Sequence, residues 1–130
     1  MGASHEGHLS LVRSAHEEND VCCASIYVNP LQFNSPSDLA SYPDTFDRDI
    51  RAFDSDHCDM VFTGTLGQFF PGAKCTGDIQ LLDPGPCAAG LEGTFRPGHL
   101  DGVATIVDRL FDTVGSCSAY FGEKDYQQTW

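Results

Sequence analysis

Two histidines three residues apart form the first segment that could carry chemistry. His5 and His8 lie in the run His5-Glu6-Gly7-His8, where apolar residues begin to recur at helical spacing. The first turn of a helix has free backbone N–H groups and the positive end of the helix dipole, so it favours anions. Gly7 lacks a Cβ and lets a bulky group approach the backbone. The pattern indicates a phosphate-binding helix start, and solvated histidines are the alternative.

Two amide side chains follow the first strand-like run. Asn29 and Gln32 lie in the segment Val28–Phe33, directly after the β-forming stretch 21–28. In a parallel α/β sheet ligands bind beyond the carboxyl ends of the strands, so these amides are placed to hydrogen-bond a small polar substrate. The alternative is a turn that ends the strand and leaves Gln32 solvated.

A lysine near the end of the sequence forms a third candidate. Lys124, one of only two lysines, lies in the run Gly122–Gln128 after another strand-like stretch. A lysine beside glycine and aspartate at a strand end can contact phosphate, and Asp125 can bind Mg²⁺ or orient a ligand hydroxyl. An exposed charge cluster is the alternative.

A fourth candidate, Arg96 with His99, precedes the last helical pattern. Either side chain is able to reach a substrate carboxylate or to cap that helix. The sequence leaves both roles open.

The elements that must position these residues alternate in type. Apolar residues recur at helical spacing in 8–19, 44–54 and 100–114, and β-forming residues gather in 21–28 and 60–62. Strands that alternate with helices form βαβ units with a parallel sheet. The sequence therefore predicts an α/β fold with helices on the faces of a parallel sheet.

Two stretches between these elements are less regular. Residues 63–98 are rich in glycine and proline, so we expect little helix there and one short strand over Asp78–Leu82. Residues 118–124 have the composition of another strand end.

Composition narrows the class of protein. The 130 residues fit one domain, and an apolar content of 41% is enough for a packed core. A net charge of −12, with only seven lysines and arginines, argues against binding nucleic acid. The apolar runs are too short to span a bilayer, and no secretory signal is visible, so we expect no membrane partner and a cytoplasmic protein.

The six cysteines lack the spacing of a disulfide framework or a zinc site. There is no Cys-x-x-Cys pair, and Cys22 and Cys23 are adjacent in a strand-like run. We expect free thiols, with Cys22 and Cys23 behaving as small buried apolar residues.

Together these segments resemble the pantothenate synthetase (pantoate–β-alanine ligase) family of the HxGH nucleotidyltransferase-like superfamily. The resemblance rests on five blocks in the family's order, across nearly all of the sequence. They are MGASHEGHLSLVR, SIYVNPLQF, DLASYPDTFDRD, LEGTFRPGHLDGVATIVDRLF and AYFGEKDYQQ.

The resemblance implies a Rossmann-like fold and an ATP-dependent ligase of pantothenate and coenzyme A biosynthesis. Pantoate would react with ATP to give pantoyl adenylate and pyrophosphate, and the amine of β-alanine would then displace AMP to give pantothenate. ATP and Mg²⁺ would be required.

The resemblance also assigns roles to residues. His8, His5 and Lys124 would be catalytic. The ATP site would consist of Met1, Gly2, Ala3, Ser4, His5, Glu6, Gly7, His8, Gly122, Glu123, Lys124 and Asp125. Pantoate and β-alanine would bind Gln32, Gln128 and Asn29, and Mg²⁺ would bind Asp49 and Asp125.

The resemblance is incomplete at both ends. The family's first strand precedes the position of Met1, and a Ser-Ser-Arg segment and a small C-terminal domain follow Gln128. We therefore expect residues 1–130 to be a partial Rossmann-like ATP- and pantoate-binding domain of a protein that is a homodimer when intact.

Two other functions stay open. One is a non-catalytic fragment that binds ligand or pairs with a full-length subunit. The other is a different HxGH nucleotidyltransferase, which would need extra cationic contacts for a phosphorylated substrate. The amides Gln32 and Gln128 in a chain with few cations favour a small carboxylic acid instead.

Overall fold

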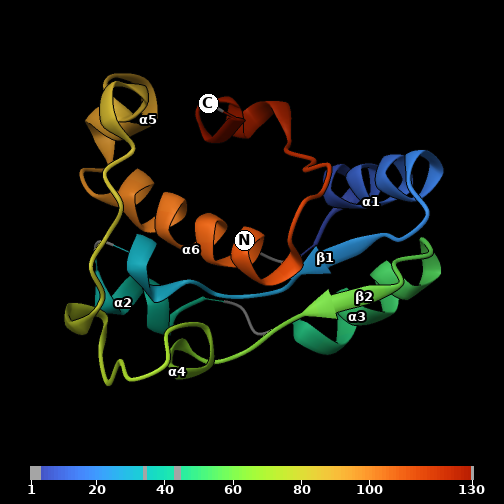
Figure 1. The fold of residues 1–130 in the computed structure, drawn as a ribbon, viewed down its shortest axis with the longest axis horizontal. Coiled ribbons are helices and arrows are strands. Elements are labelled where there is room, and N and C mark those ends of the chain that lie inside the picture. The colour runs from blue at the N-terminus through green and yellow to red at the C-terminus, as the bar shows by residue number, and fades with distance from the viewer. Residues whose placement is uncertain (1–3, 34, 43–44, 130) are drawn as a thin grey trace.

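The computed structural model describes residues 4–33, 35–42 and 45–129 (Figure 1). Its α-helices are α1 (Glu6–Glu18), α2 (Pro36–Ala40), α3 (Phe46–Ser55), α4 (Leu66–Phe69), α5 (Leu91–Phe95) and α6 (His99–Val114). Its strands are β1 (Cys23–Ser25) and β2 (Met60–Phe62). Its 3₁₀ helices are η1 (Pro30–Gln32), η2 (Thr76–Asp78), η3 (Gly85–Ala88) and η4 (Glu123–Thr129).

The two strands form a parallel sheet. Cys23 pairs with Met60 and Ser25 with Phe62, and the connection between the strands runs through α2 and α3. Helices α1 and α3 lie alongside the strands (Figure 1). The predicted α/β fold, a parallel sheet with flanking helices, is confirmed.

A small core joins α1, α3 and the sheet. Val12, Cys22 and Phe53 are buried there, and six partly buried residues pack around them: Leu9, Ala15, Ala24, Ile26, Cys58 and Val61. Burial is the main cause that raises the pKa of the Cys22 thiol to about 11. All six cysteines lie in described residues and are free thiols, and Cys22 packs as a small apolar residue.

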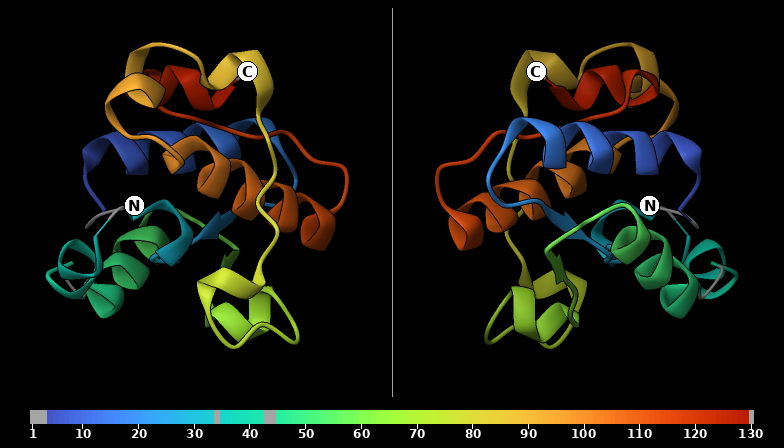
Figure 2. Two further views of the ribbon diagram at one scale, coloured as in Figure 1. Left: turned by 90° about the vertical axis from the view of Figure 1, so that its left-hand side faces the viewer. Right: turned by 90° about the vertical axis from the view of Figure 1, so that its right-hand side faces the viewer.

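Helix α6 contacts η1, the turn that follows β1. The contact is between backbones, because a Cβ on Gly102 would lie only 2.4 Å from the carbonyl oxygen of Leu31. Both views in Figure 2 place α5 and η4 at one end of the molecule and the α4 region at the other.

Three predicted helices are present with shifted ends. The helix predicted over 8–19 begins at Glu6, because the ring nitrogen Nδ1 of His5 accepts the N–H of Gly7 and caps it. The helices predicted over 44–54 and 100–114 are α3 and α6. Asp44, the first residue of the former prediction, lies outside the described residues.

The strand predicted over 60–62 is confirmed as β2, and the other predicted strands are too long or wrong. The strand over 21–28 is limited to β1, because its partner β2 has only three residues. Residues 118–122 form no strand, since β1 and β2 pair with each other and Tyr120 is held by side chains instead. Its hydroxyl donates to Glu18 and accepts from the Asn19 amide, both at 2.8 Å.

The irregular stretch 63–98 contains more helix than expected. It holds α4, α5 and two 3₁₀ turns. The strand predicted over Asp78–Leu82 is wrong, because Asp78 accepts the N–H groups of Lys74 and Cys75 and closes the turn η2. The N–H of Leu82 donates to the hydroxyl of Thr105 rather than to a strand.

None of the helices in the described ranges is both long and apolar enough to pass through a bilayer.

The contact between α6 and η1 predicts the effect of a methyl group. Gly102→Ala should lower the free energy of unfolding by about 1–3 kcal/mol, because the two backbones must separate. Gly67→Ala, in α4, is the matched control. A Cβ on Gly67 would lie 3.9 Å from its nearest neighbour, the carbonyl oxygen of Ala73. That variant should gain about 0.5–1 kcal/mol from helix propensity. Urea denaturation measures both, and equal stability of the two variants would contradict the close contact.

Candidate active site

The two histidines lie together at the start of α1. His5 is the residue that caps the helix, and the rings of His5 and His8 stack with centroids 4.0 Å apart. A Cβ on Gly7 would lie 3.0 Å from the His5 ring, so glycine gives that ring its place. The sequence pattern therefore does bring both imidazoles to a helix N-terminus.

His8 has the environment of a neutral ring with an open hydrogen-bonding position. Burial lowers the pKa of His8, and the charges of His5 and Lys124 lower it further, while Asp125 opposes them. Its atom Nδ1 is buried and has no partner among the described residues. A buried polar atom without a partner costs about 1–3 kcal/mol, which a bound ligand would recover.

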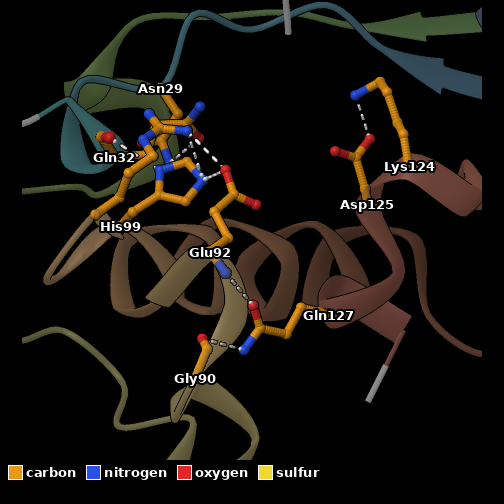
Figure 3. Close-up of polar contacts among 9 residues, drawn as sticks. Asn29, Gln32, Gly90, Glu92, His99, Lys124, Asp125 and Gln127 are labelled. Atoms are coloured by element: carbon orange, nitrogen blue, oxygen red, sulfur yellow. Dashed lines mark hydrogen bonds and ion pairs between the residues drawn. The ribbon is translucent and has the colours of Figure 1, made fainter. Parts of the chain in front are cut away.

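Lys124 and Asp125 come from the far end of the chain. Lys124 Nζ donates to Asp125 Oδ2 at 2.5 Å, and both charges act on the pKa of His8 (Figure 3). The N–H of Asp125 donates to the carbonyl of Gly122 and closes the turn at the start of η4. Glu123 and Lys124 are exposed. The two segments predicted to contact ATP thus act on one imidazole.

Asp49, on α3, is hydrogen-bonded to Ser4, which lies two residues before the start of α1. Its oxygen Oδ1 accepts from the backbone N–H of Ser4 at 2.9 Å and from the Ser4 hydroxyl at 2.5 Å. Its oxygen Oδ2 accepts from the Thr45 hydroxyl at 2.8 Å. Burial alone would raise the pKa of Asp49, but these hydrogen bonds outweigh it and hold the pKa below its usual value. The carboxylate positions the start of α1.

Asn29 is held in one orientation by the backbone. It is 1% exposed, its Oδ1 accepts the N–H of Leu31 at 3.2 Å, and its Nδ2 donates to the carbonyl of Gly102 at 3.0 Å. A backbone N–H only donates and a carbonyl only accepts, so the side-chain amide cannot be reversed.

The orientation of Asn29 determines that of Gln32. Asn29 Nδ2 also donates to Gln32 Oε1 at 3.2 Å, which leaves Gln32 Nε2 as the end able to donate to a ligand. Gln32 is 4% exposed. Among the described residues, the donor end of the amide predicted to bind the acid has no hydrogen-bond partner.

Of the two adjacent glutamines in η4, Gln127 holds the helix in place. Gln127 Oε1 accepts the N–H of Glu92 at 3.1 Å, and Nε2 donates to the carbonyls of Cys87 and Gly90 (Figure 3). Gln128 is half-buried. The structural role of Gln127 was missed, because a tandem pair gives no signal of which residue turns inward.

The remaining predicted site residues differ in exposure, and three of them lie outside the described ranges. Glu6 is exposed, and its carboxylate accepts from Arg13 on α1. Gly122 is half-buried. Met1, Gly2 and Ala3, predicted to contact ATP, lie outside the described residues.

The charges around His8 predict the direction in which two substitutions should shift its pKa. Lys124→Met should raise the pKa of His8, because it removes a repelling positive charge, and Asp125→Asn should lower it further. NMR titration of the His8 ring measures both shifts. Lys74→Met, which removes the other lysine, is the control that should leave the His8 titration unchanged. Shifts of the same sign in the first two variants would refute the arrangement.

The orientation of the Asn29 amide predicts how a substitution there should change stability. Asn29→Asp keeps the acceptor for Leu31 but turns an oxygen toward the Gly102 carbonyl and Gln32 Oε1, so unfolding should require about 3 kcal/mol less. Gln80→Glu adds the same charge at an exposed amide and should change stability by under about 0.5 kcal/mol. Chemical denaturation compares the two, and a fully stable Asn29→Asp variant would show that the amide is not held as described.

Two kinds of sequence comparison identify relatives. The family model for pantoate-beta-alanine ligase matches residues 1–130. The pantothenate synthetase of Roseiflexus castenholzii is 46% identical over 129 residues, which are 99% of this chain and 45% of that protein. The enzyme of Aliivibrio salmonicida is 48% identical over 98% of this chain and 42% of its own length.

Solved structures agree with these relatives. Pantothenate synthetase from Thermus thermophilus superposes with a TM-score of 0.87 at 43% identity, over 98% of this chain and 45% of that chain. The Francisella tularensis pantoate-beta-alanine ligase, solved in complex with beta-gamma ATP and beta-alanine, gives 0.89 at 40% identity, over 99% and 48%. The chain thus spans a little under half the length of the relatives it matches, and it belongs to the pantoate–β-alanine ligase family.

Proposed function

We propose that this chain provides the ATP- and pantoate-binding part of an enzyme that condenses (R)-pantoate with β-alanine. The products are pantothenate, AMP and pyrophosphate. The observation that carries the proposal is the stacked pair His5 and His8 at a helix start, where His8 Nδ1 is buried with no partner among the described residues and the charge of Lys124 acts on the ring. The Francisella tularensis relative in complex with beta-gamma ATP and beta-alanine supports the same ligand classes.

The reaction has two steps. A carboxylate oxygen of pantoate attacks the α-phosphorus of ATP, and the bond to pyrophosphate breaks. The amine of β-alanine then attacks the acyl carbon, the bond to AMP breaks, and the amine loses a proton. The pantoate carboxylate is already ionised at neutral pH, so the first step requires no general base.

We assign the triphosphate to the start of α1. Charge grows on the departing pyrophosphate, and preorganised donors stabilise it. His8, His5 and Lys124 supply such donors, together with the positive end of the α1 helix dipole. The predicted contacts of Met1, Gly2 and Ala3 belong to the same proposal.

We assign the carboxylate and hydroxyl groups of pantoate to the amides. Gln32 Nε2 is the open donor, and Gln128 would complete the pocket from η4. The hydrogen bonds of Asn29 go to Leu31, Gly102 and Gln32, so Asn29 would act by holding Gln32.

Magnesium would bind together with the phosphates. Mg²⁺ is commonly held by one or two carboxylates and substrate phosphates, where it neutralises phosphate charge. Asp125, half-buried beside His8, fits that role. Asp49 does not, because both of its oxygens accept hydrogen bonds from Ser4 and Thr45. Within the described ranges no three His, Cys, Asp or Glu side chains form a metal-binding group.

The setting of the enzyme is part of the proposal. Six free thiols are compatible with the reducing cytoplasm, where we place the reaction. The homodimer that the family resemblance implies stays a prediction.

The two other functions differ in what they would bind. A nucleotidyltransferase acting on a phosphorylated substrate needs further cations, whereas the candidate site has amides beside one lysine. A non-catalytic fragment would bind ATP and pantoate but form no AMP. Because the chain spans less than half the length of its relatives, the experiments below include this function.

Calorimetric titration tests the binding proposal. The chain should bind ATP and pantoate, and His8→Ala should weaken ATP binding by about tenfold, since a hydrogen bond to a charged group contributes about 1.5–3 kcal/mol. His16→Ala, at an exposed position of the same helix, is the matched control and should bind ATP like the parent. Equal ATP affinity in both variants would remove His8 from the site.

Pantoate-dependent exchange of labelled pyrophosphate into ATP then separates the three functions. Exchange supports the proposed ligase, binding without exchange indicates the non-catalytic fragment, and exchange that depends on a phosphorylated alcohol indicates the other transferase.

A further inference from the structure

The buried His99 contacts the backbone of Gln32, the glutamine that the proposed function assigns to the acid substrate. His99, the first residue of α6, is 3% exposed, and its ring nitrogen Nδ1 lies 3.0 Å from the backbone oxygen of Gln32 (Figure 3). The other ring nitrogen, Nε2, lies 3.2 Å from Arg96 Nη1 and 3.4 Å from Glu92 Oε1. Both ends of the ring are therefore engaged.

The partners of the ring determine its tautomer. A backbone oxygen only accepts, so Nδ1 carries the hydrogen. At Nε2 the nearer partner is Arg96 Nη1 at 3.2 Å, which only donates, while Glu92 Oε1 at 3.4 Å already accepts from that guanidinium, so Nε2 presents its lone pair to Arg96. Arg96 Nη1 also donates to Glu92 Oε1 at 2.9 Å, and this ion pair keeps the guanidinium against the ring.

Gln32 is consequently held at two independent points. Asn29 holds the side-chain oxygen, and His99 holds the backbone oxygen. Neither contact uses Gln32 Nε2, the donor that the proposed function assigns to the acid substrate. A displacement of the η1 backbone would move that donor away from the carboxylate, and misplaced donors of this kind lose much of their effect.

We infer that His99 is a positioning residue for recognition of the acid substrate, acting through the backbone of Gln32 with hydrogen on Nδ1. Arg96 and Glu92 maintain that tautomer. The inference rests on the proposed function, in which Gln32 binds the carboxylic acid. It distinguishes His99 from the histidines of α1, which are assigned to the nucleotide.

Two substitutions separate positioning from general packing. His99→Asn can place its amide nitrogen where Nδ1 lies and keep the hydrogen bond to Gln32, but it loses the contact with Arg96. His99→Gln can still accept from Arg96 through its longer side chain, but it loses the bond to Gln32. The two variants are similar in polarity and differ in which ring nitrogen they replace.

Calorimetric titration of each variant with pantoate and ATP provides the binding test. His99→Gln should weaken pantoate binding by about tenfold, and His99→Asn by about threefold or less, while ATP binding stays within about twofold in both. A loss shared equally by both variants and both ligands would overturn the inference, because it would indicate only a structural role.

NMR of the parent chain provides a test that needs neither ligand nor variant. The ¹⁵N shifts of the His99 ring should show a protonated Nδ1 and an unprotonated Nε2, and the Nδ1 hydrogen should couple to the Gln32 carbonyl carbon. Hydrogen on Nε2 would overturn the inference even if the variants fail to fold. A parent chain with the expected tautomer and coupling that binds no pantoate would instead refute the proposed function of the chain and leave the contact intact.

Discussion

Helix α6 and the turn η1 approach each other so closely at Gly102 that no Cβ fits between their backbones. The approach lets the Gly102 carbonyl reach the Asn29 amide, and it brings the first residue of α6 within hydrogen-bonding distance of Gln32. Helix α6 thus supplies the acceptor that orients one amide and the imidazole that holds the next residue. Without this contact, η1 would be an ordinary turn after a short strand.

A second constraint organises the nucleotide half of the site. The chain carries a net charge of −12, so a polyphosphate would be repelled unless local groups compensate. In the proposed site this compensation would come from His8 in the first turn of α1 and from Lys124, whose charge acts on the His8 ring. Asp49 fixes that helix start from α3 by accepting both donors of Ser4. In the proposed anion site this acidic residue would therefore contribute by holding the backbone.

The sequence pattern predicted best what depends on local periodicity. The apolar stripe of α6 and the helical spacing of α1 were recognised, and the HxGH pattern placed two imidazoles together. Of the predicted strands only 60–62 has the predicted bounds, because a β-forming segment such as 118–122 needs a neighbour that the pattern does not reveal. The Tyr120 hydroxyl finds Glu18 and Asn19, about a hundred residues earlier in the sequence, and no local rule anticipates that contact.

The candidate site shows the same division. Gln32 was identified from its position after a strand, but which of its ends is open depends on Leu31 and Gly102, through Asn29. Likewise, His99 was recognised as a residue that could cap a helix or reach a substrate carboxylate, and in the structure its ring lies between the Gln32 backbone oxygen and the side chains of Arg96 and Glu92. Residue type and spacing thus identify the groups that can bind, while the direction of each hydrogen bond is set by backbone atoms from distant segments. Backbone donors and acceptors cannot exchange roles, so a site oriented by them has its polarity fixed before any ligand arrives. If the proposed function holds, an anionic substrate in this acidic protein would meet a few donors of fixed direction in place of a large cluster of cations.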